Sequence, residues 1–364
     1  MAVRDFLGKA RQKILRILFG KNLYANTDQV NNQECLIREQ TNRINTLENR
    51  LAEQNHLINE QRGRIDHLYW FSSYRAQKYA LESKYPEILS DWYCDATGKK
   101  LDLNNPRTFN EKIQWLKLYD STPLKTRLAD KFLVRDWVKE KIGKEYLIPL
   151  LGVYDSFDEI DFNVLPERFV LKANHGSGWN IIVKNKEEFN KEQAKHNMDS
   201  WMRTNFAYCA GLELQYFDIV PKIIVEEYLG DEDGSGNLSD YKFFCFNGKP
   251  KYIQVDIDRY TNHKRNVYDL AWNLQPFVFQ YQNGKNTPPP DNLHEIVHIA
   301  NILSKEFCFV RCDFYLVHKK IYFGEMTFTP ESGQGKFKPE GWNLKFGNMI
   351  KLPIDEKSPM GSAL

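Results

Sequence analysis

Several features that mark specialised classes of protein are missing from this sequence. The formal net charge of its 364 residues is only +2, which gives no reason to expect a nucleic-acid binder. The six cysteines contain no CxxC pair and no zinc spacing, so we expect reduced cysteines in the core of a cytoplasmic protein. No apolar run approaches the length of a membrane-spanning helix, and the N-terminus lacks the uninterrupted apolar stretch of a signal peptide. The chain does have 42% apolar and 27% charged residues, which is ordinary for a globular protein with room for two or more domains.

The first 22 residues carry six basic side chains and a single acidic one, with apolar residues at mostly helical spacing. A basic amphipathic helix of this kind can rest on anionic lipid, which would place the protein peripherally on the inner face of the cell membrane. A helix docked on its own protein, or a solvated chain end, are the alternatives. Residues 1–22 are therefore predicted as an amphipathic helix and a candidate membrane contact.

Residues 23–70 contain a heptad pattern. One apolar residue recurs at every seventh position without a miss, in the series Leu23, Val30, Ile37, Ile44, Leu51, Ile58 and Ile65. The companion position holds Leu47 and Leu68 but is otherwise Asn or Gln. This period predicts a long coiled coil and hence a homo-oligomer, whose strand number the polar companions leave open. A long helix packed against its own domain is the alternative.

From residue 71 onward the pattern is that of a globular α+β body. A capping box begins a helix at Thr108, with Glu111 three residues later, and a second helix is expected from Pro123 to Gly143. After Pro149 apolar strands and loops dominate. We expect a helical part at 71–160, a strand-rich part at 161–352 and a tail at 353–364.

The segment RCDFYLVHKKIYFGEMTFTP, which begins at Arg311, reads as a β-hairpin with two facing carboxylates. If His318–Lys320 is the turn, Asp313 lies opposite Glu325, and Phe323 shares the face of Glu325. Two carboxylates ~4 Å apart repel by roughly 4 kcal/mol at an effective dielectric of about 20. A shared proton, or a bound cation such as Mg²⁺, would relieve that repulsion. A register shifted by one residue, with both carboxylates in solvent, is the alternative.

A second motif is the segment FVLKANHGSGWNIIV, an apolar strand followed by a small-residue loop and another strand. Glycines allow backbone N–H groups to approach phosphate oxygens, and a lysine adds a point charge. The residues concerned are Lys172, Gly176, Ser177 and Gly178. Their spacing is not that of a P-loop, and an ordinary glycine hairpin is the alternative.

Two acidic pairs lie at the ends of apolar strands. Asp256 and Asp258 form a D-x-D of the kind that holds the metal of a nucleotide sugar in glycosyltransferases, although the motif is short and common. Glu226 and Glu227 end the strand KIIVEE, where an exposed strand end competes with a backbone edge suited to adenine.

Taken in order, these pieces resemble the ATP-grasp superfamily. Its order is a lysine in an early helix, a strand lysine before a Gly-rich loop, a hydrophobic strand ending in Glu, and an R-x-D…E-x-N hairpin. More closely, NPRTFNEKIQWLKLYD, VLKANHGSGWN and EMTFTPESGQG look like the TupA-like ATP-grasp proteins of bacterial surface-polysaccharide gene clusters. The resemblance covers roughly residues 80–350 and departs from the superfamily pattern at Thr327, which replaces Asn.

The resemblance implies an ATP-grasp fold, ATP and Mg²⁺ as cofactors, and a role for each matching residue. Asp313 and Glu325 would bind Mg²⁺, with Thr327 as a third candidate ligand. Arg311 and Lys172 are the candidate catalytic residues, and Arg311 would contact the transferred γ-phosphoryl group. The candidate nucleotide contacts are Lys131, Lys172, Gly176, Ser177, Gly178, Glu226, Glu227 and Asp240, the last for ribose.

We therefore expect an ATP- and Mg²⁺-dependent carboxylate–amine ligase that acts through an acyl phosphate. It would build or modify a bacterial surface polysaccharide of the capsule or teichuronopeptide kind. Its partners would be ATP, a uronic acid or other carboxylate-bearing glycan, and an amine acceptor, with no nucleic acid. A glycosyltransferase that uses Asp256 and Asp258, and a non-catalytic coiled-coil scaffold, are the alternatives.

Overall fold

The computed structural model describes residues 27–230, 239–258 and 262–354. The predicted amphipathic helix at 1–22 and most of the predicted tail at 353–364 lie outside these ranges. The chain divides into two compact units between residues 70 and 71.

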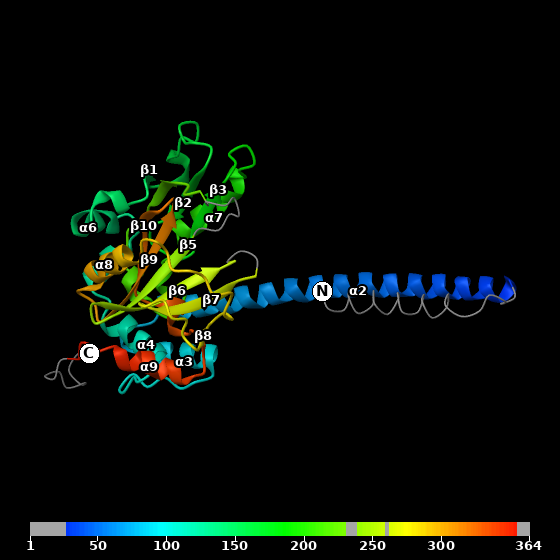
Figure 1. Ribbon diagram of the computed structural model, residues 1–364, viewed down its shortest axis with the longest axis horizontal. Helices are drawn as coiled ribbons and strands as arrows, with labels where there is room; N and C mark the ends of the chain where they lie inside the picture. Colours follow the sequence, from blue (N-terminus) through cyan, green and yellow to red (C-terminus); the bar gives the residue numbers. More distant parts are fainter. Residues whose placement is uncertain (1–26, 231–238, 259–261, 355–364) are drawn as a thin grey trace. The chain divides into compact units, whose positions relative to one another are not determined.

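The first unit contains most of α2, a single helix from Thr27 to Lys78 (Figure 1). A long helix over the heptad region is thus confirmed, whereas the coiled coil stays a prediction. Six of the heptad side chains are 42% to 66% exposed, namely Ile44, Leu47, Leu51, Ile58, Ile65 and Leu68, whereas Ile37 is half-buried. None of the helices in the described ranges is both long enough and apolar enough to cross a membrane.

The second unit is a mixed α/β body, as the sequence predicts. Besides the end of α2 and several short 3-10 helices, its α-helices in the described ranges are α3 (Tyr85–Thr97), α4 (Phe109–Tyr119), α5 (Pro123–Ala129), α6 (Val134–Lys141), α7 (Lys191–Met202), α8 (Leu293–Ser304) and α9 (Gly341–Met349). Its strands there are β1 (Leu150–Tyr154), β2 (Phe169–Ala173), β3 (Asn180–Val183), β4 (Ile223–Glu227), β5 (Ser239–Phe246), β6 (Lys249–Ile257), β7 (Lys264–Asp269), β8 (Val278–Phe279), β9 (Phe309–Val317), β10 (Lys320–Thr327) and β11 (Phe337–Lys338).

These strands form two main antiparallel sheets. One has the order β1-β4-β2-β3 and the other the order β10-β9-β5-β6-β7 (Figure 1). The short strands β8 and β11 pair with each other. The smaller main sheet buries one face against α7, through a core that includes Leu171, Val225 and Met198.

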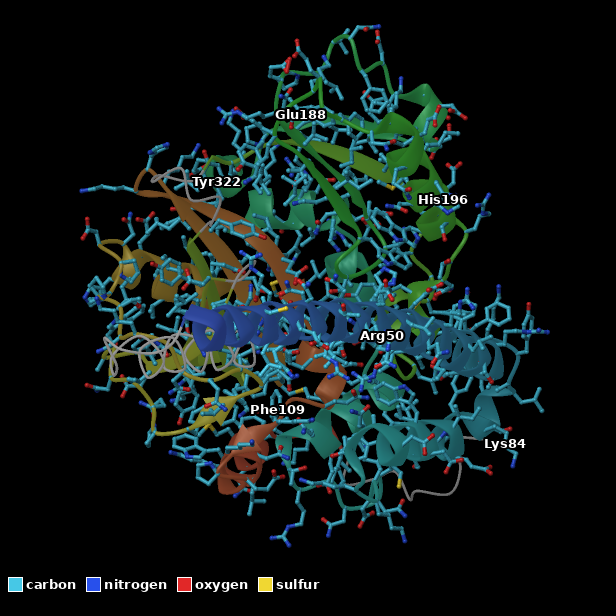
Figure 2. The ribbon with its side chains drawn as sticks, turned by 90° about the vertical axis from the view of Figure 1, so that its right-hand side faces the viewer. Arg50, Lys84, Phe109, Glu188, His196 and Tyr322 are labelled. Atoms are coloured by element: carbon cyan, nitrogen blue, oxygen red, sulfur yellow. The ribbon has the colours of Figure 1, made fainter. Side chains whose placement is uncertain are left out.

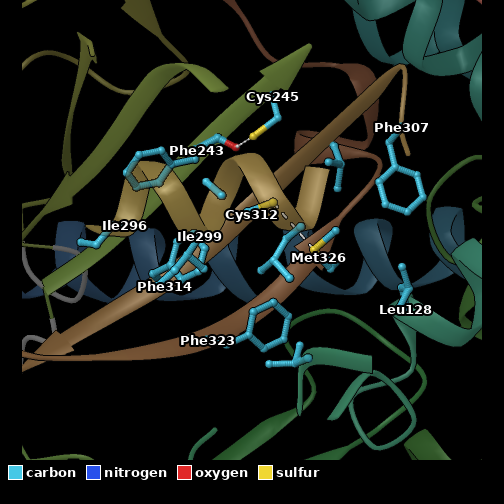
Figure 3. Packing of buried hydrophobic residues seen from close by; sticks show 14 of the residues in the cluster. Leu128, Phe243, Cys245, Ile296, Ile299, Phe307, Cys312, Phe314, Phe323 and Met326 are labelled. Carbon is cyan, nitrogen blue, oxygen red and sulfur yellow. Dashed lines mark hydrogen bonds between the residues drawn. The ribbon is translucent and has the colours of Figure 1, made fainter. Parts of the chain in front are cut away.

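The five-stranded sheet is covered on both faces. On one face, Phe243 of β5 and Phe314 of β9 pack with Ile296 and Ile299 of α8 (Figure 3). On the other face, aromatic residues of the sheet pack against Phe109 of α4, which lies beside α9 (Figure 2).

The second face of this sheet is apolar at one end of its strands and charged at the other. On β5, Phe244 and Phe246 belong to the aromatic cluster, and Lys242, two residues before Phe244, shares their face. On β9, Phe309 belongs to the same cluster, and Arg311 follows it on the same face. One face of one sheet therefore carries an apolar half that anchors it and a charged half that can meet a ligand.

Two sequence expectations about this unit are wrong. The helix predicted from Pro123 to Gly143 is split into α5 and α6, because Asp130 leaves the helical conformation and its carboxylate accepts hydrogen bonds from the N–H groups of Phe132 and Leu133. The cysteines are free, as expected, but Cys94 of α3 is exposed rather than in the core, and so is Cys35 in the first unit.

The last turns of α2 belong to the second unit, and this generates a stability prediction. The Gln77 side chain is buried and accepts a hydrogen bond from the Leu212 N–H at 3.0 Å, and the Tyr74 hydroxyl accepts one from Asn205 N–H at 3.3 Å. Deletion of residues 1–70 keeps both contacts, so thermal unfolding of the body should remain cooperative with little change in midpoint. Deletion of residues 1–78 should lower its stability clearly.

The substitution Gln77→Ala in the full chain should cost about 1–3 kcal/mol, because it leaves a buried N–H unpaired. Gln54→Ala, at an exposed position of α2, is the matched control and should change little. Equal stabilities of the two truncated proteins would show that α2 does not support the body.

Candidate functional site

A cavity of about 620 Å³ lies between the two main sheets, lined by residues of both. The small sheet contributes Lys172 and Glu226, and the large sheet contributes Lys242, Arg311 and Glu325. Residues far apart in the sequence thus meet because the charged half of one face of the large sheet and the face of the small sheet away from its core line the same space.

The hairpin of β9 and β10 places its two carboxylates, Asp313 and Glu325, opposite each other, as predicted, although its turn is shorter than predicted and its register shifts along β10. Its turn has two residues, His318 and Lys319, both with positive φ as a tight hairpin turn requires. A bulge at Gly324 then adds one residue to β10, and only beyond it does Glu325 pair with Asp313.

Gly324 itself has little room for a side chain. A Cβ there would lie 3.0 Å from the carbonyl oxygen of Asp313 and 3.2 Å from the ring of Tyr315. The expectation that Phe323 shares the face of Glu325 is wrong, because before the bulge Phe323 pairs with Phe314 and packs in the core.

The facing carboxylates are neutralised by cations of the protein. Arg311 grips Asp313 with two hydrogen bonds, Nε to Oδ1 at 2.7 Å and Nη2 to Oδ2 at 2.6 Å. The Lys242 ammonium lies 3.3 Å from Asp313 Oδ2 and donates a closer hydrogen bond to Asp240. Burial lowers the pKa of Lys242, but the two carboxylates outweigh it and raise that pKa.

Glu325 completes this charged cluster. Its Oε1 accepts a hydrogen bond from the Thr327 hydroxyl at 2.9 Å and lies 3.7 Å from Arg311 Nη2. Although burial would raise the pKa of Glu325, Lys131, Arg311 and Lys242 lower it to about 2. Glu325 is therefore an anion at neutral pH with its carboxylate directed into the cavity.

The donor set suits a cation that shares its ligands with a nucleotide. Asp313, Glu325 and Thr327 offer hard oxygen atoms on one face of the hairpin. In the part of the chain that the structure describes, no three His, Cys, Asp or Glu side chains form a metal cage of their own. Two carboxylates with phosphate oxygens are a usual magnesium environment, so the residues present fit Mg²⁺ bound together with a phosphate ligand.

Lys172 faces this cluster from the other sheet. Its ammonium donates to Glu226 Oε2 at 2.5 Å, and Arg135 of α6 donates to Glu226 Oε1 at 2.8 Å. Glu226 is therefore a buried partner of two cations. The alternative reading of Glu226 and Glu227 as an exposed strand end fits only Glu227, whose N–H donates to the carbonyl oxygen of Pro149.

Lys131 lies beside the small-residue loop. It is not in an early helix, as the resemblance implies, but in the turn that follows α5. Its ammonium donates to the carbonyl oxygen of Gly176, and burial lowers its pKa although Glu325 opposes that effect. In the loop, Ser177 and Gly178 line the cavity, and Gly178 has a φ of +73° that favours glycine.

One wall of the cavity is apolar, and the sequence motifs did not mark it. Val134 of α6, Leu147, Ile224 of β4 and Phe323 of β10 line it. Asp240, expected at the ribose, is buried and bonded to Lys242 instead of standing among the lining residues. These apolar side chains come from four separate segments, so a local pattern could not reveal that they share a wall.

The D-x-D residues do not form a shared site. Arg265 of β7 binds Asp256 with Nε to Oδ1 at 2.6 Å, and His263 lies 3.2 Å from the same oxygen. Burial opposes ionisation of Asp256, but these partners hold its pKa well below the usual range. Asp258 lies on the exposed turn after β6, with a φ of +50°. The geometry does not favour a metal held between them.

The loop after β10 forms another part of the wall that the motifs left without a role. Glu331 and Ser332 both adopt left-handed conformations, with φ 50° and ψ 26°, and Glu331 pairs with Arg265 at 2.6 Å. Behind the loop, the buried ammonium of Lys117 donates to the carbonyl and hydroxyl oxygens of Ser332, and burial lowers the pKa of Lys117 to about 7. The backbone strain is thus held in place by contacts beneath the cavity.

Comparison with solved structures finds distant similarities. A D-alanine–D-alanine ligase from Bacillus anthracis in complex with ATP aligns at 14% identity and a TM-score of 0.35, over 61% of this chain and 63% of its own. An L-amino acid ligase from Bacillus licheniformis aligns at 9% identity and a TM-score of 0.36, over 57% of this chain and 44% of its own. The chain thus spans less than two thirds of the length of either protein. No curated protein matches it.

Comparison with protein families is more direct. The model of the TupA-like ATP-grasp family matches residues 111–351, which is most of the chain and includes every candidate site residue described above. The match confirms the family predicted from the sequence motifs, and the chain therefore belongs to the TupA-like ATP-grasp family.

Proposed function

We propose that this protein is an ATP- and Mg²⁺-dependent carboxylate–amine ligase. The observation that carries the proposal is the pairing of the buried Asp313 with Glu325, which lines a cavity whose walls also hold Lys131, Lys172 and Arg311. Membership of the ATP-grasp family supports the same nucleotide chemistry.

The triphosphate would lie between the two sheets. Lys131 and Lys172 would meet its oxygens from one side, with backbone N–H groups of Gly176, Ser177 and Gly178 closing over it. The purine would lie against the apolar wall at Leu147, Ile224 and Phe323. The backbone beside Glu226 and Glu227 remains the proposed contact for adenine. A ribose contact by Asp240 rests on the resemblance alone, because its carboxylate is buried against Lys242 and does not line the cavity.

Asp313 and Glu325, with the Thr327 hydroxyl, would hold the metal ion. When bound, Mg²⁺ would neutralise negative charge on the phosphates and bring them into line with the attacking group. Arg311, fixed by its fork on Asp313, would direct its remaining N–H donors towards the transferred phosphoryl group.

The reaction would proceed in two balanced steps. A substrate carboxylate oxygen attacks the γ-phosphorus and the bond to the β-phosphate oxygen breaks, which gives an acyl phosphate and ADP. An amine then attacks the acyl carbon, loses a proton and expels inorganic phosphate, which leaves an amide. The protein's part is positioning and charge neutralisation.

The substrate class follows from the resemblance rather than from the cavity. We propose a uronic acid or another carboxylate-bearing glycan as carboxylate donor and an amino acid or amino sugar as acceptor, in surface-polysaccharide biosynthesis. The glycosyltransferase alternative is weaker, because Asp256 is already bound by Arg265 and Asp258 lies on an exposed turn. A panel of thermal shifts with ATP and with nucleotide sugars, each with and without Mg²⁺, separates the two.

We also propose that α2 forms a coiled coil between copies of this chain. Its exposed heptad side chains would bury their apolar surface on association, at about 25 cal/mol per Å². Such an oligomer could hold several active sites near a membrane-bound glycan, and residues 1–22 would supply the membrane contact.

The metal assignment predicts the effect of neutral substitutions. Asp313→Asn and Glu325→Gln should each lower ATP turnover roughly 100-fold or more, because each removes a charge aimed at the metal and phosphates. Asp256→Asn should matter much less. ADP release with a panel of uronic acids and amines measures the effect, and circular dichroism checks the fold. A greater loss in Asp256→Asn than in the other two would favour the glycosyltransferase.

The phosphate assignment predicts weaker nucleotide binding without the two lysines. Lys131→Met and Lys172→Met should each weaken ATP binding roughly tenfold, because each removes a charged donor facing the triphosphate. Lys222→Met is the matched control, since that lysine pairs with Asp155 away from the cavity lining. Unchanged calorimetric affinity in both cavity variants would exclude this placement of ATP.

The coiled-coil assignment predicts a change of mass. Ile44→Glu combined with Ile58→Glu should lower the mass measured by light scattering, because both acids enter the apolar seam. Asn45→Glu with Asn59→Glu adds the same charge one residue along and should leave the oligomer intact. A single mass for all three proteins would show that the heptad face is not the interface.

A further inference from the structure

Lys242 is a buried cation for which no sequence motif assigned a role. It lies on β5 directly opposite Asp313 of β9 in the register of the sheet. Its ammonium contacts Asp240 and, at 3.3 Å, Asp313 Oδ2, and all three side chains are less than a tenth exposed. Lys242 also lines the cavity. It therefore stands between the candidate metal ligand and the space proposed for the nucleotide.

The contacts of Asp313 are not equivalent. The planar guanidinium of Arg311 binds both oxygens at once, at 2.7 and 2.6 Å, and such a fork is strong and geometrically fixed. Lys242 makes one longer contact to an oxygen that Arg311 also uses. Its flexible stem lets the ammonium rotate away while Arg311 remains in place. A cation that approaches Asp313 from the cavity would thus displace the lysine rather than the arginine.

The charges around Asp313 also favour displacement of Lys242 when metal and nucleotide bind together. Three carboxylates (Asp240, Asp313 and Glu325) lie among three cations (Arg311, Lys242 and Lys131), so the charges of these six side chains cancel. The neighbouring Glu331 and Asp256 are held by Arg265. A divalent ion that bound without a nucleotide would add uncompensated positive charge. A triphosphate that arrived with it would cancel that charge and offer a new partner to a displaced ammonium.

We propose that Lys242 and the divalent cation are alternative partners of Asp313, so that metal binding turns the Lys242 ammonium towards the nucleotide phosphates. The inference rests on the proposed function and adds to it that the metal ion binds together with the nucleotide rather than before it. Lys242 is then a positioning residue that keeps bare metal out of the site. The affinity of the protein for a divalent cation in the absence of nucleotide therefore measures how strongly Lys242 competes with the metal.

The test is a titration with Mn²⁺, followed by electron paramagnetic resonance, on the full-length protein without nucleotide. Lys242→Met should bind Mn²⁺ roughly tenfold more tightly than the wild type, because the competing charged contact is gone. The double variant Lys242→Met/Asp240→Asn keeps the net charge unchanged and should show the same gain. It also avoids leaving Asp240 as a buried charge without its lysine.

Lys125→Met is the matched control. Lys125 is likewise a buried lysine paired with an aspartate, Asp120, but it does not line the cavity. Its substitution should leave the Mn²⁺ affinity unchanged, whereas a gain equal to that of the Lys242 variants would overturn the inference.

Two further outcomes separate this inference from the proposed function. A wild-type protein that binds Mn²⁺ with ADP, while neither Lys242 variant gains affinity for Mn²⁺ alone, overturns the role of Lys242 and leaves the ligase intact. A wild-type protein that binds Mn²⁺ neither alone nor with ADP overturns the metal site and the inference together.

Discussion

Carboxylates buried around one cavity are the constraint on which this structure depends. Three of these carboxylates each contact one arginine and one further basic side chain. Asp313 contacts Arg311 and Lys242. In the same way, Glu226 contacts Arg135 and Lys172, and Asp256 contacts Arg265 and His263. A buried ion that loses its partner destabilises a protein by about 3–5 kcal/mol. The residues that make the cavity charged are therefore also those that hold its walls together.

Within each strand, the charged side chains lie on the cavity side of the sheet and the neighbouring apolar side chains lie on the core side, so the charges stay out of the core. On β5 the cavity side carries Lys242 and then Phe244, while Phe243 on the other side packs against α8. Because side chains alternate, a shift of one residue would exchange the charged and the apolar sets. At Gly324 a bulge interrupts this alternation, so that Glu325 pairs with Asp313 although Phe323, two residues earlier, packs with Phe314 on the other face.

Much of this arrangement can be predicted from the sequence, and the exceptions have physical causes. The family, the long helix and the facing of Asp313 and Glu325 follow from local periodicity and motif order. The short turn and the bulge offset each other, so the correct pairing was reached from an incorrect turn. The break at Asp130 depends on a side chain that competes for backbone N–H groups. Lys242 becomes visible only when β5 is placed beside β9, and strand order is not a local property.

The arginines and lysines of the cavity have different roles: the arginines hold the buried carboxylates, and the lysines are placed to bind a ligand. Each arginine holds its carboxylate by more than one contact or is tied to a further group, as Arg135 is to the carbonyl oxygen of Ile148. Lys172 and Lys242 contact their carboxylates through a single ammonium on a flexible stem, and both line the cavity. Arg135 alone can keep Glu226 paired, and Arg311 alone can keep Asp313 paired, so neither of these two carboxylates is left bare when its lysine turns to an anionic ligand. The internal ion pairs thus prepare the cavity for a polyanion, since the lysines that it would recruit already face the space that it would enter.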